Sequence, residues 1–207
     1  MSDARPGRFI TFEGVDGAGK STHVEWFAER LAARCGVEVV VTREPGGTPV
    51  GEALRELLLH RPMHLETETL LMFAARRQLV ADIIRPALVR GAWVVCDRFT
   101  DSTVAYQGGG RGLARERIES LRDWVHPDLE PTTTFLFDLA PDVAQRRLDA
   151  TRDKDRFERE TAAFFDRVRR TYLQLAESEP RRFVLIDSSE DVAAIRLKLE
   201  VHLATLC

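Results

Sequence analysis

The residues from Gly14 to Ser21, GVDGAGKS, have types and a spacing that suit phosphate binding, because they match G-x-x-x-x-G-K-[ST]. Glycines let a backbone bend so that its N–H groups point at phosphate oxygens, and a following helix directs the positive end of its dipole there. In such a loop the lysine reaches the β- and γ-phosphates and the hydroxyl holds Mg²⁺. We therefore expect the phosphates of a nucleotide to be bound by Gly14, Val15, Asp16, Gly17, Ala18, Gly19, Lys20, Ser21 and Thr22, with Ser21 at the metal.

The segments that flank this phosphate-binding loop (P-loop) fit the same interpretation. The apolar run from Phe9 to Phe12 predicts a short buried strand. After the loop, apolar residues from Val24 to Cys35 recur with the period of an amphipathic helix. Strand, glycine loop and helix is the order that the motif requires. The alternative, a glycine-rich turn that binds nothing, is therefore disfavoured.

Strand and helix signals alternate along the rest of the chain. Further buried strands are predicted at 37–42, 92–97, 132–139 and 182–187. Helices are predicted at 50–60, 66–90 (kinked by Pro86), 114–125, 141–150, from Phe157 to Leu175, and at 191–205, whereas the glycine run 108–112 predicts an irregular segment. This order predicts one α/β domain, residues 1–207, with a five-stranded parallel sheet in a three-layer α/β/α arrangement.

The ligand-binding edge of such a sheet lies beyond the carboxyl ends of its strands. Four loops follow predicted strands there, at residues 14–21, 43–48, 97–107 and 187–190. We expect all four to line one rim.

Composition limits the classes of partner and compartment. The formal net charge of the 207 residues is −3, so we expect neither a nucleic-acid partner nor an acidic membrane surface. Cys35, Cys96 and Cys207 form no C-x-x-C pair, which favours reduced thiols in a cytoplasmic protein. No apolar run approaches the ~18 residues of a membrane span. The start, MSDARPG, does not resemble a signal peptide, and residues 1–7 are expected to be a flexible end.

Five motifs together resemble those of the bacterial thymidylate kinases, a family of nucleoside monophosphate kinases. They are FEGVDGAGKST, TREPGGTPVGE, LLMFAARRQLV, CDRFTDSTVAYQGGGRG and TRDKDRFERE, and they span nearly the whole chain. The resemblance implies transfer of the γ-phosphate of ATP to dTMP, giving dTDP and ADP with Mg²⁺, a step in dTTP biosynthesis. It also implies the P-loop nucleoside monophosphate kinase fold, a small lid at about 150–157, and a homodimer packed through helices.

The resemblance assigns the acceptor phosphate to Arg98 of the DR pair, supported by Arg43, Glu44 and Pro45 of TREPGGT. It also suggests a cis bond before Pro45, although a trans turn proline is the alternative. Asp16 would reach the sugar 3′-hydroxyl or nearby cations. Asp97, at the end of a predicted strand, is expected to hold Mg²⁺ through water or to position the P-loop. The alternatives are a surface ion pair of Arg98 with Asp97 and a solvent-facing Asp16.

The base pocket is expected from two other motifs. Arg76 interrupts an apolar stripe and therefore needs a polar partner, which the resemblance identifies as a thymine carbonyl. By the same resemblance, Gln107 with Ser102 or Thr103 would bond the imide edge and Tyr106 would pack near C2′ of the sugar. Phe73 is the candidate for stacking on the base. Because the family's aromatic lies four residues before the arginine, where this chain has Met72, Phe73 as plain core stays open.

The charged stretch 151–156 resembles a lid that closes over ATP, with Arg152, Lys154 or Arg156 acting on the transferring phosphate. An arginine in that role contributes roughly 10³–10⁵ in rate. The alternative is a solvated run of charges. The predicted catalytic residues are therefore Lys20, Arg98, Asp16, Arg152 and Arg156.

Two other functions remain as alternatives. A kinase for dUMP or dCMP on the same scaffold is one, because a single methyl group changes binding by only ~1–3 kcal/mol. A P-loop GTPase switch is the other, but guanine recognition there uses N-K-x-D and this chain contains no asparagine.

Overall fold

The computed structural model describes residues 7–149 and 155–207. Its centre is a five-stranded sheet whose neighbouring strands are all parallel, in the order β2-β3-β1-β4-β5. The strands are β1 (Phe9–Gly14), β2 (Val39–Arg43), β3 (Trp93–Asp97), β4 (Thr133–Asp138) and β5 (Phe183–Asp187). The predicted fold class is confirmed. The end of the chain predicted to be flexible lies outside the described residues, apart from Gly7.

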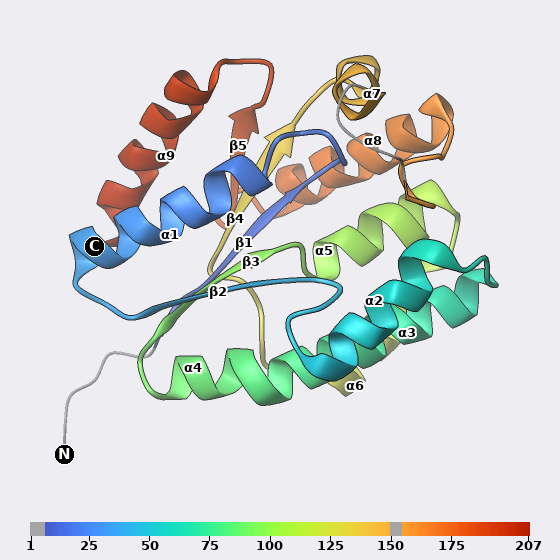
Figure 1. The fold of residues 1–207 in the computed structure, drawn as a ribbon, viewed down its shortest axis with the longest axis horizontal. Helices are drawn as coiled ribbons and strands as arrows, with labels where there is room; N and C mark the ends of the chain where they lie inside the picture. The colour runs from blue at the N-terminus through green and yellow to red at the C-terminus, as the bar shows by residue number, and fades with distance from the viewer. Residues whose placement is uncertain (1–6, 150–154) are drawn as a thin grey trace.

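Helices cover both faces of the sheet (Figure 1). They are α1 (Ser21–Cys35), α2 (Pro49–His60), α3 (Leu65–Leu79), α4 (Arg85–Val89), α5 (Thr100–Thr103), α6 (Arg115–Val125), α7 (Pro141–Asp149), α8 (Ala162–Ser178) and α9 (Val192–Leu206). Two π-helical segments, η1 (Val80–Ile84) and η2 (Val104–Gly110), join α3 to α4 and continue α5. None of the described helices is long and apolar enough to cross a membrane.

Side chains of β1 alternate between the two faces of the sheet, and so they pack against helices on both sides. Phe12 packs its ring 5.4 Å from that of Phe27 on α1. Phe9 points to the other face, where it belongs to a buried cluster with residues of η1 and α4. Successive strand residues face opposite sides of a sheet, so Glu13 shares the face of Phe9. A carboxylate is thereby placed inside the core beneath the carboxyl edge.

The glycine run corrects the sequence prediction of an irregular segment, because Gly108–Gly110 lie within η2. The physical reason is close approach to α8. A Cβ on Gly109 would overlap Oγ1 of Thr171, and one on Gly110 would lie 2.5 Å from the ring of Phe164. Glycine is used here for space, not for a turn. The predicted break before Pro86 is realised as η1.

The cysteines also differ from expectation. Cys35 at the end of α1 and Cys207 at the chain terminus form a disulfide, whereas Cys96 is free and buried. The prediction of three reduced thiols is therefore wrong for two of them. The two cysteines are 172 residues apart in sequence, so no local pattern could reveal that α1 and α9 lie side by side.

Candidate active site

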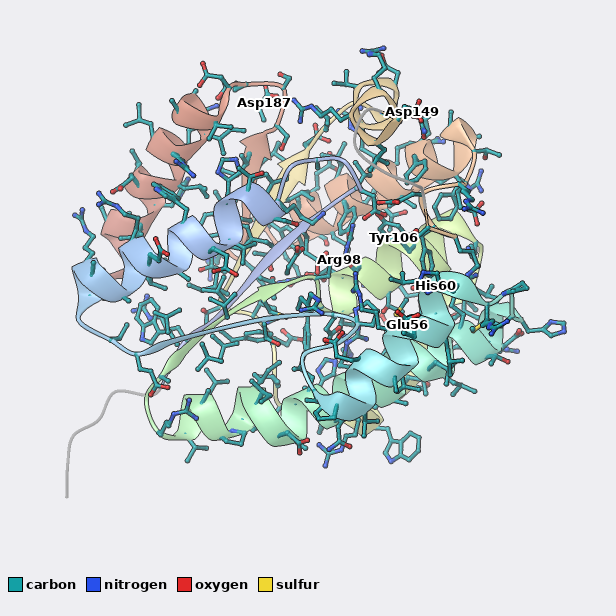
Figure 2. The ribbon with its side chains drawn as sticks, viewed as in Figure 1. Glu56, His60, Arg98, Tyr106, Asp149 and Asp187 are labelled. Carbon is teal, nitrogen blue, oxygen red and sulfur yellow. A yellow bond between two sulfur atoms is a disulfide. The ribbon has the colours of Figure 1, made fainter. Side chains whose placement is uncertain are left out.

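A cleft of about 800 Å³ opens at the carboxyl edge of the sheet. Its walls come from the P-loop, the loop after β2, α3, the segment after β3, α7 and residues 155–158. Of the four loops expected at this rim, three line the cleft, and the loop 187–190 does not. Figure 2 shows Arg98 and Tyr106 near the centre of the molecule, beyond the end of β3.

Lys20 lies in the cleft wall, and its ammonium group points toward the backbone of the P-loop. Its Nζ donates to the carbonyl oxygens of Gly14, at 3.1 Å, and Val15, at 3.2 Å. Burial, and next the positive charge of Arg98, lower the pKa of Lys20. Gly17 and Gly19 have φ values of 80° and 83°, which glycine adopts without strain. An anion bound in the P-loop would offset the repulsion between Lys20 and Arg98.

Ser21 and Asp97 meet beside Lys20. The Ser21 hydroxyl donates to Oδ2 of Asp97 at 3.2 Å, while Oδ1 of Asp97 is buried without a hydrogen-bond partner among the described residues. The described chain has no cluster of three or more His, Cys, Asp or Glu side chains for a metal. One hydroxyl and one carboxylate suit Mg²⁺ that takes its other oxygens from phosphates and water.

Arg98 is held in a network with Asp16 and Tyr106. Its Nη2 donates to Oδ1 of Asp16 at 2.6 Å and to the Tyr106 hydroxyl at 3.1 Å, and that hydroxyl donates to Oδ2 of Asp16 at 2.8 Å. Burial raises the pKa of Asp16, but Arg98 and Lys20 outweigh it and hold that pKa below its usual value. The alternative, a surface ion pair of Arg98 with Asp97, is not found in the described part of the chain; the Arg98 guanidinium faces the cleft with Asp16.

Arg76 forms a buried pair with Glu44. Its Nε lies 2.8 Å from Oε2 of Glu44, and its Nη2 donates to the Thr103 hydroxyl at 3.0 Å. Nη1 of Arg76 and Oε1 of Glu44 are buried without partners among the described residues. Burial raises the pKa of Glu44 against the opposing effect of Arg76. The Glu44–Pro45 bond is cis. The unpartnered donor and acceptor are suited to a planar polar ligand.

Gln107 and Ser102 also line the cleft, but their side chains are engaged beneath it. Nε2 of Gln107 donates to Oε1 of Glu68 at 2.7 Å, which leaves its carbonyl oxygen for a ligand. Ser102 binds Glu13 and Arg98.

The stacking assignment for Phe73 is corrected. Phe73 is 2% exposed and packs with Ile118 and Val125, in a cluster separate from the cleft. Its ring lies 4.6 Å from the guanidinium carbon of Arg76 and so supports that arginine from behind. Met72 and Phe99 line the cleft instead.

Arg156 is engaged beside the cleft in this structure, and its role on the transferring phosphate stays a prediction. Its guanidinium donates to the carbonyl oxygen of Leu58, at 2.9 Å from Nη2, and pairs with Glu68 at 2.6 Å. Arg156 does not line the cleft in the described structure. Arg152 and most of the predicted lid lie outside the described residues.

Two arginines of the cleft carry no motif and were missed. Arg55 of α2 donates to the Pro45 carbonyl at 2.9 Å, and Arg147 of α7 donates to the Ser188 carbonyl at 3.0 Å. Burial, and then the charge of Arg43, lower the pKa of Arg55, with Arg98 adding to the effect. Arg43 itself binds Glu52 at 2.8 Å. Three cations therefore converge on one part of the cleft, which suits an anionic ligand.

Comparison with known proteins agrees with this geometry. A family model described as thymidylate kinase matches residues 12–198. The chain is 62% identical over 203 residues to a thymidylate kinase of Ralstonia nicotianae, covering 97% of this chain and 99% of that protein. It is 60% identical over 200 residues to one of Cupriavidus metallidurans, with the same coverage. A crystal structure of thymidylate kinase from Ehrlichia chaffeensis superposes with a TM-score of 0.78 at 35% identity, covering 96% of this chain and 99% of that one.

Proposed function

The chain belongs to the thymidylate kinase family and phosphorylates dTMP to dTDP with ATP as donor, and from this premise we propose how its residues divide the work. The donor phosphates lie on the P-loop, where Lys20 leaves its two carbonyl partners for the β- and γ-oxygens. The N-terminus of α1 adds its dipole at the same point. Arg147 borders this donor side.

The acceptor dTMP occupies the other half of the cleft. Arg98, with Arg43 and Arg55, binds its phosphate, because all three line the cleft and the charges of Arg43 and Arg98 both act on Arg55. Arg76, Gln107 and Thr103 meet the polar edge of thymine, and Asp16 with Tyr106 borders the sugar. Phosphoryl transfer needs little covalent help, so this head-on arrangement is the main contribution of the protein.

Mg²⁺ completes the proposal. Ser21 and the unpartnered Oδ1 of Asp97 are the atoms that would hold it, directly or through water. When bound, the ion supplies positive charge that neutralises the β- and γ-phosphate oxygens.

A homodimer in the cytoplasm is also proposed. Large apolar side chains are exposed on neighbouring helices, at Leu57 of α2, Leu70 of α3 and Trp124 of α6. Light scattering at micromolar concentration is expected to give twice the chain mass, and a monomer would remove the dimer from the proposal.

One observation carries this assignment of roles. A single cleft is lined by Lys20 of the P-loop and by both Arg98 and Arg76, with the residues that bind them. Arg98→Ala is expected to raise the KM for dTMP at least roughly tenfold, as loss of a charged hydrogen bond does, while the KM for ATP changes little. A coupled assay of ADP release measures both. Arg115→Ala is the control, since Arg115 is exposed on α6, pairs with Glu119 of the same helix and does not line the cleft.

Equal changes in both KM values would contradict the acceptor role of Arg98. The same assay with dUMP and dCMP tests the base pocket. We expect the highest kcat/KM with dTMP, and a higher value with either competitor would favour a different monophosphate kinase on this scaffold.

A further inference from the structure

Glu13 of β1 is a carboxylate in the core that the proposed chemistry does not use. It is 0% exposed, and it is not among the residues that line the cleft. Buried carboxylates are rare and need partners. Glu13 has three, all donors: the backbone N–H of Phe99 at 2.7 Å, the Ser102 hydroxyl at 2.6 Å and the Tyr172 hydroxyl at 2.8 Å. These donors come from three segments, the turn after β3, α5 and α8.

All three partners of Glu13 surround Arg98. Among the described residues, Arg98 is the non-glycine residue with positive φ, at 71°, a conformation that a side chain disfavours and that its surroundings must impose. The N–H that Glu13 accepts belongs to the next residue, Phe99. One carboxylate oxygen therefore fixes the backbone at the strained position.

The other carboxylate oxygen acts on the Arg98 side chain. Oε2 accepts from both Ser102 and Tyr172, and the same two hydroxyl oxygens accept from Nη1 of Arg98 at 3.0 and 3.2 Å. A hydroxyl has one proton, so each hydroxyl that donates to Glu13 must present its lone pairs to the guanidinium. The two hydroxyls can therefore accept from Arg98 only while Glu13 accepts from them.

We propose that Glu13 is the positioning residue for Arg98, which it holds through the Phe99 amide and the Ser102 and Tyr172 hydroxyls in the orientation that binds the acceptor phosphate. The inference rests on the proposed role of Arg98 and adds to it a group that does not touch substrate. A neutral carboxyl group would donate to one hydroxyl. That hydroxyl would then turn its proton toward the guanidinium, and a contact that orients Arg98 would be lost.

Burial, and next the charge of Asp101, raise the pKa of Glu13 to about 7. The charged and titratable groups that face it are Asp101, Arg98, Tyr172, Lys20 and Cys96. Because the carboxylate is the form that orients Arg98, dTMP binding should strengthen as the pH rises through about 7. The phosphate of dTMP also ionises near pH 6, so a variant without the carboxylate is needed to separate the two effects.

The test measures kcat and the KM values for dTMP and ATP between about pH 6 and 9 in wild type, Glu13→Gln and Arg98→Ala. Glutamine keeps the size of glutamate but carries an amide donor. We expect Glu13→Gln to raise the dTMP KM about tenfold at pH 8, with the ATP KM unchanged. We also expect the ratio of mutant to wild-type dTMP KM to shrink toward pH 6. Glu119→Gln, which makes the same change at a partly exposed glutamate of α6 outside the cleft, is the control.

Tyr172→Phe is a second variant that keeps the carboxylate and its bond to Phe99, and it serves if Glu13→Gln does not fold. It removes one bridge and should raise the dTMP KM about threefold, with the pH dependence of wild type. An unchanged dTMP KM in the folded variants, or parallel rises for dTMP and ATP, would overturn the inference. If Arg98→Ala also leaves the dTMP KM unchanged, the proposed role of Arg98 fails; if only Arg98→Ala raises it, the positioning role alone fails.

Discussion

Arg76 illustrates how a buried charge can be arranged for a ligand. It is 2% exposed, pairs with Glu44 and lies between the rings of Phe73 and Phe99, yet one of its terminal nitrogens has no partner among the described residues. A buried donor left without a partner costs about 1–3 kcal/mol. A thymine carbonyl that accepts from this nitrogen would recover that free energy when dTMP binds.

Arg76→Lys tests this explanation. Lysine keeps the charge but has no planar set of donors, so it cannot serve Glu44, Thr103 and a ligand together. We expect kcat/KM for dTMP to fall roughly 10- to 100-fold, while ATP binding measured by fluorescence titration is retained. Arg77→Lys is the matched control, because Arg77 is the next residue of α3 and is exposed. Equal losses in the two variants would count against a specific role for Arg76.

Sequence motifs correctly predicted which side chains line the cleft wherever the motif determines both the residue type and the backbone conformation. Lys20, Arg98 and Arg76 line it as expected, and so do Tyr106 and Gln107. Phe73 was assigned wrongly because neighbouring residues on a helix point about 100° apart, so a difference of one position exchanges core for cleft. Arg55 was missed because nothing in its own helix distinguishes it from a surface arginine.

Glu68 ties three elements together behind the cleft. Its carboxylate is 0% exposed and accepts from Gln107 of η2, from Arg111 at 2.7 Å and from Arg156 at 2.6 Å. Arg111 also pairs with Glu160 at 2.7 Å. Ion pairs through Glu68 and Arg111 therefore hold segment 155–160 against α3 and the end of η2. The sequence places these residues far apart, so this arrangement could not be read from spacing alone.

Removing the charge of Glu68 should loosen this junction. Glu68→Gln leaves two largely buried guanidinium groups without their shared carboxylate, and breaking such a pair costs about 3 kcal/mol. For a chain of this length the melting temperature should fall by roughly 6–12 °C. Glu66→Gln, on an exposed position of the same helix, should leave it unchanged. Calorimetric melting curves compare the two variants, and a matching Tm for both would show that the buried pairs add little.

The architecture of the whole chain was the most predictable feature. Alternating strands and helices specify a parallel sheet, and a parallel sheet places the loops after its strands at one edge. Contacts between distant helices were not predictable, because nothing local encodes them. The close approach of η2 to α8, which requires Gly109 and Gly110, is one example, and the disulfide between Cys35 and Cys207 is another.

This disulfide joins two residues that are 172 positions apart and links the end of the P-loop helix to the last residue of the chain. Such a long closure restricts the unfolded chain, and native bridges typically add about 2–4 kcal/mol. Adding a reductant to the oxidised protein should therefore lower its melting temperature by roughly 4–16 °C. Thiol titration in denaturant should count one thiol per chain, Cys96, before reduction and three after it.

Cys207→Ser separates the bridge from other effects of the reductant. Cys207 is the exposed last residue, so the substitution removes the disulfide and little packing. Without reductant this variant should melt with the reduced wild type, and reductant should not lower its melting temperature further. kcat should be the same in all three forms, because the bridge lies at the end of α1 opposite Lys20. A variant as stable as the oxidised wild type would show that the bridge contributes nothing to the folded chain.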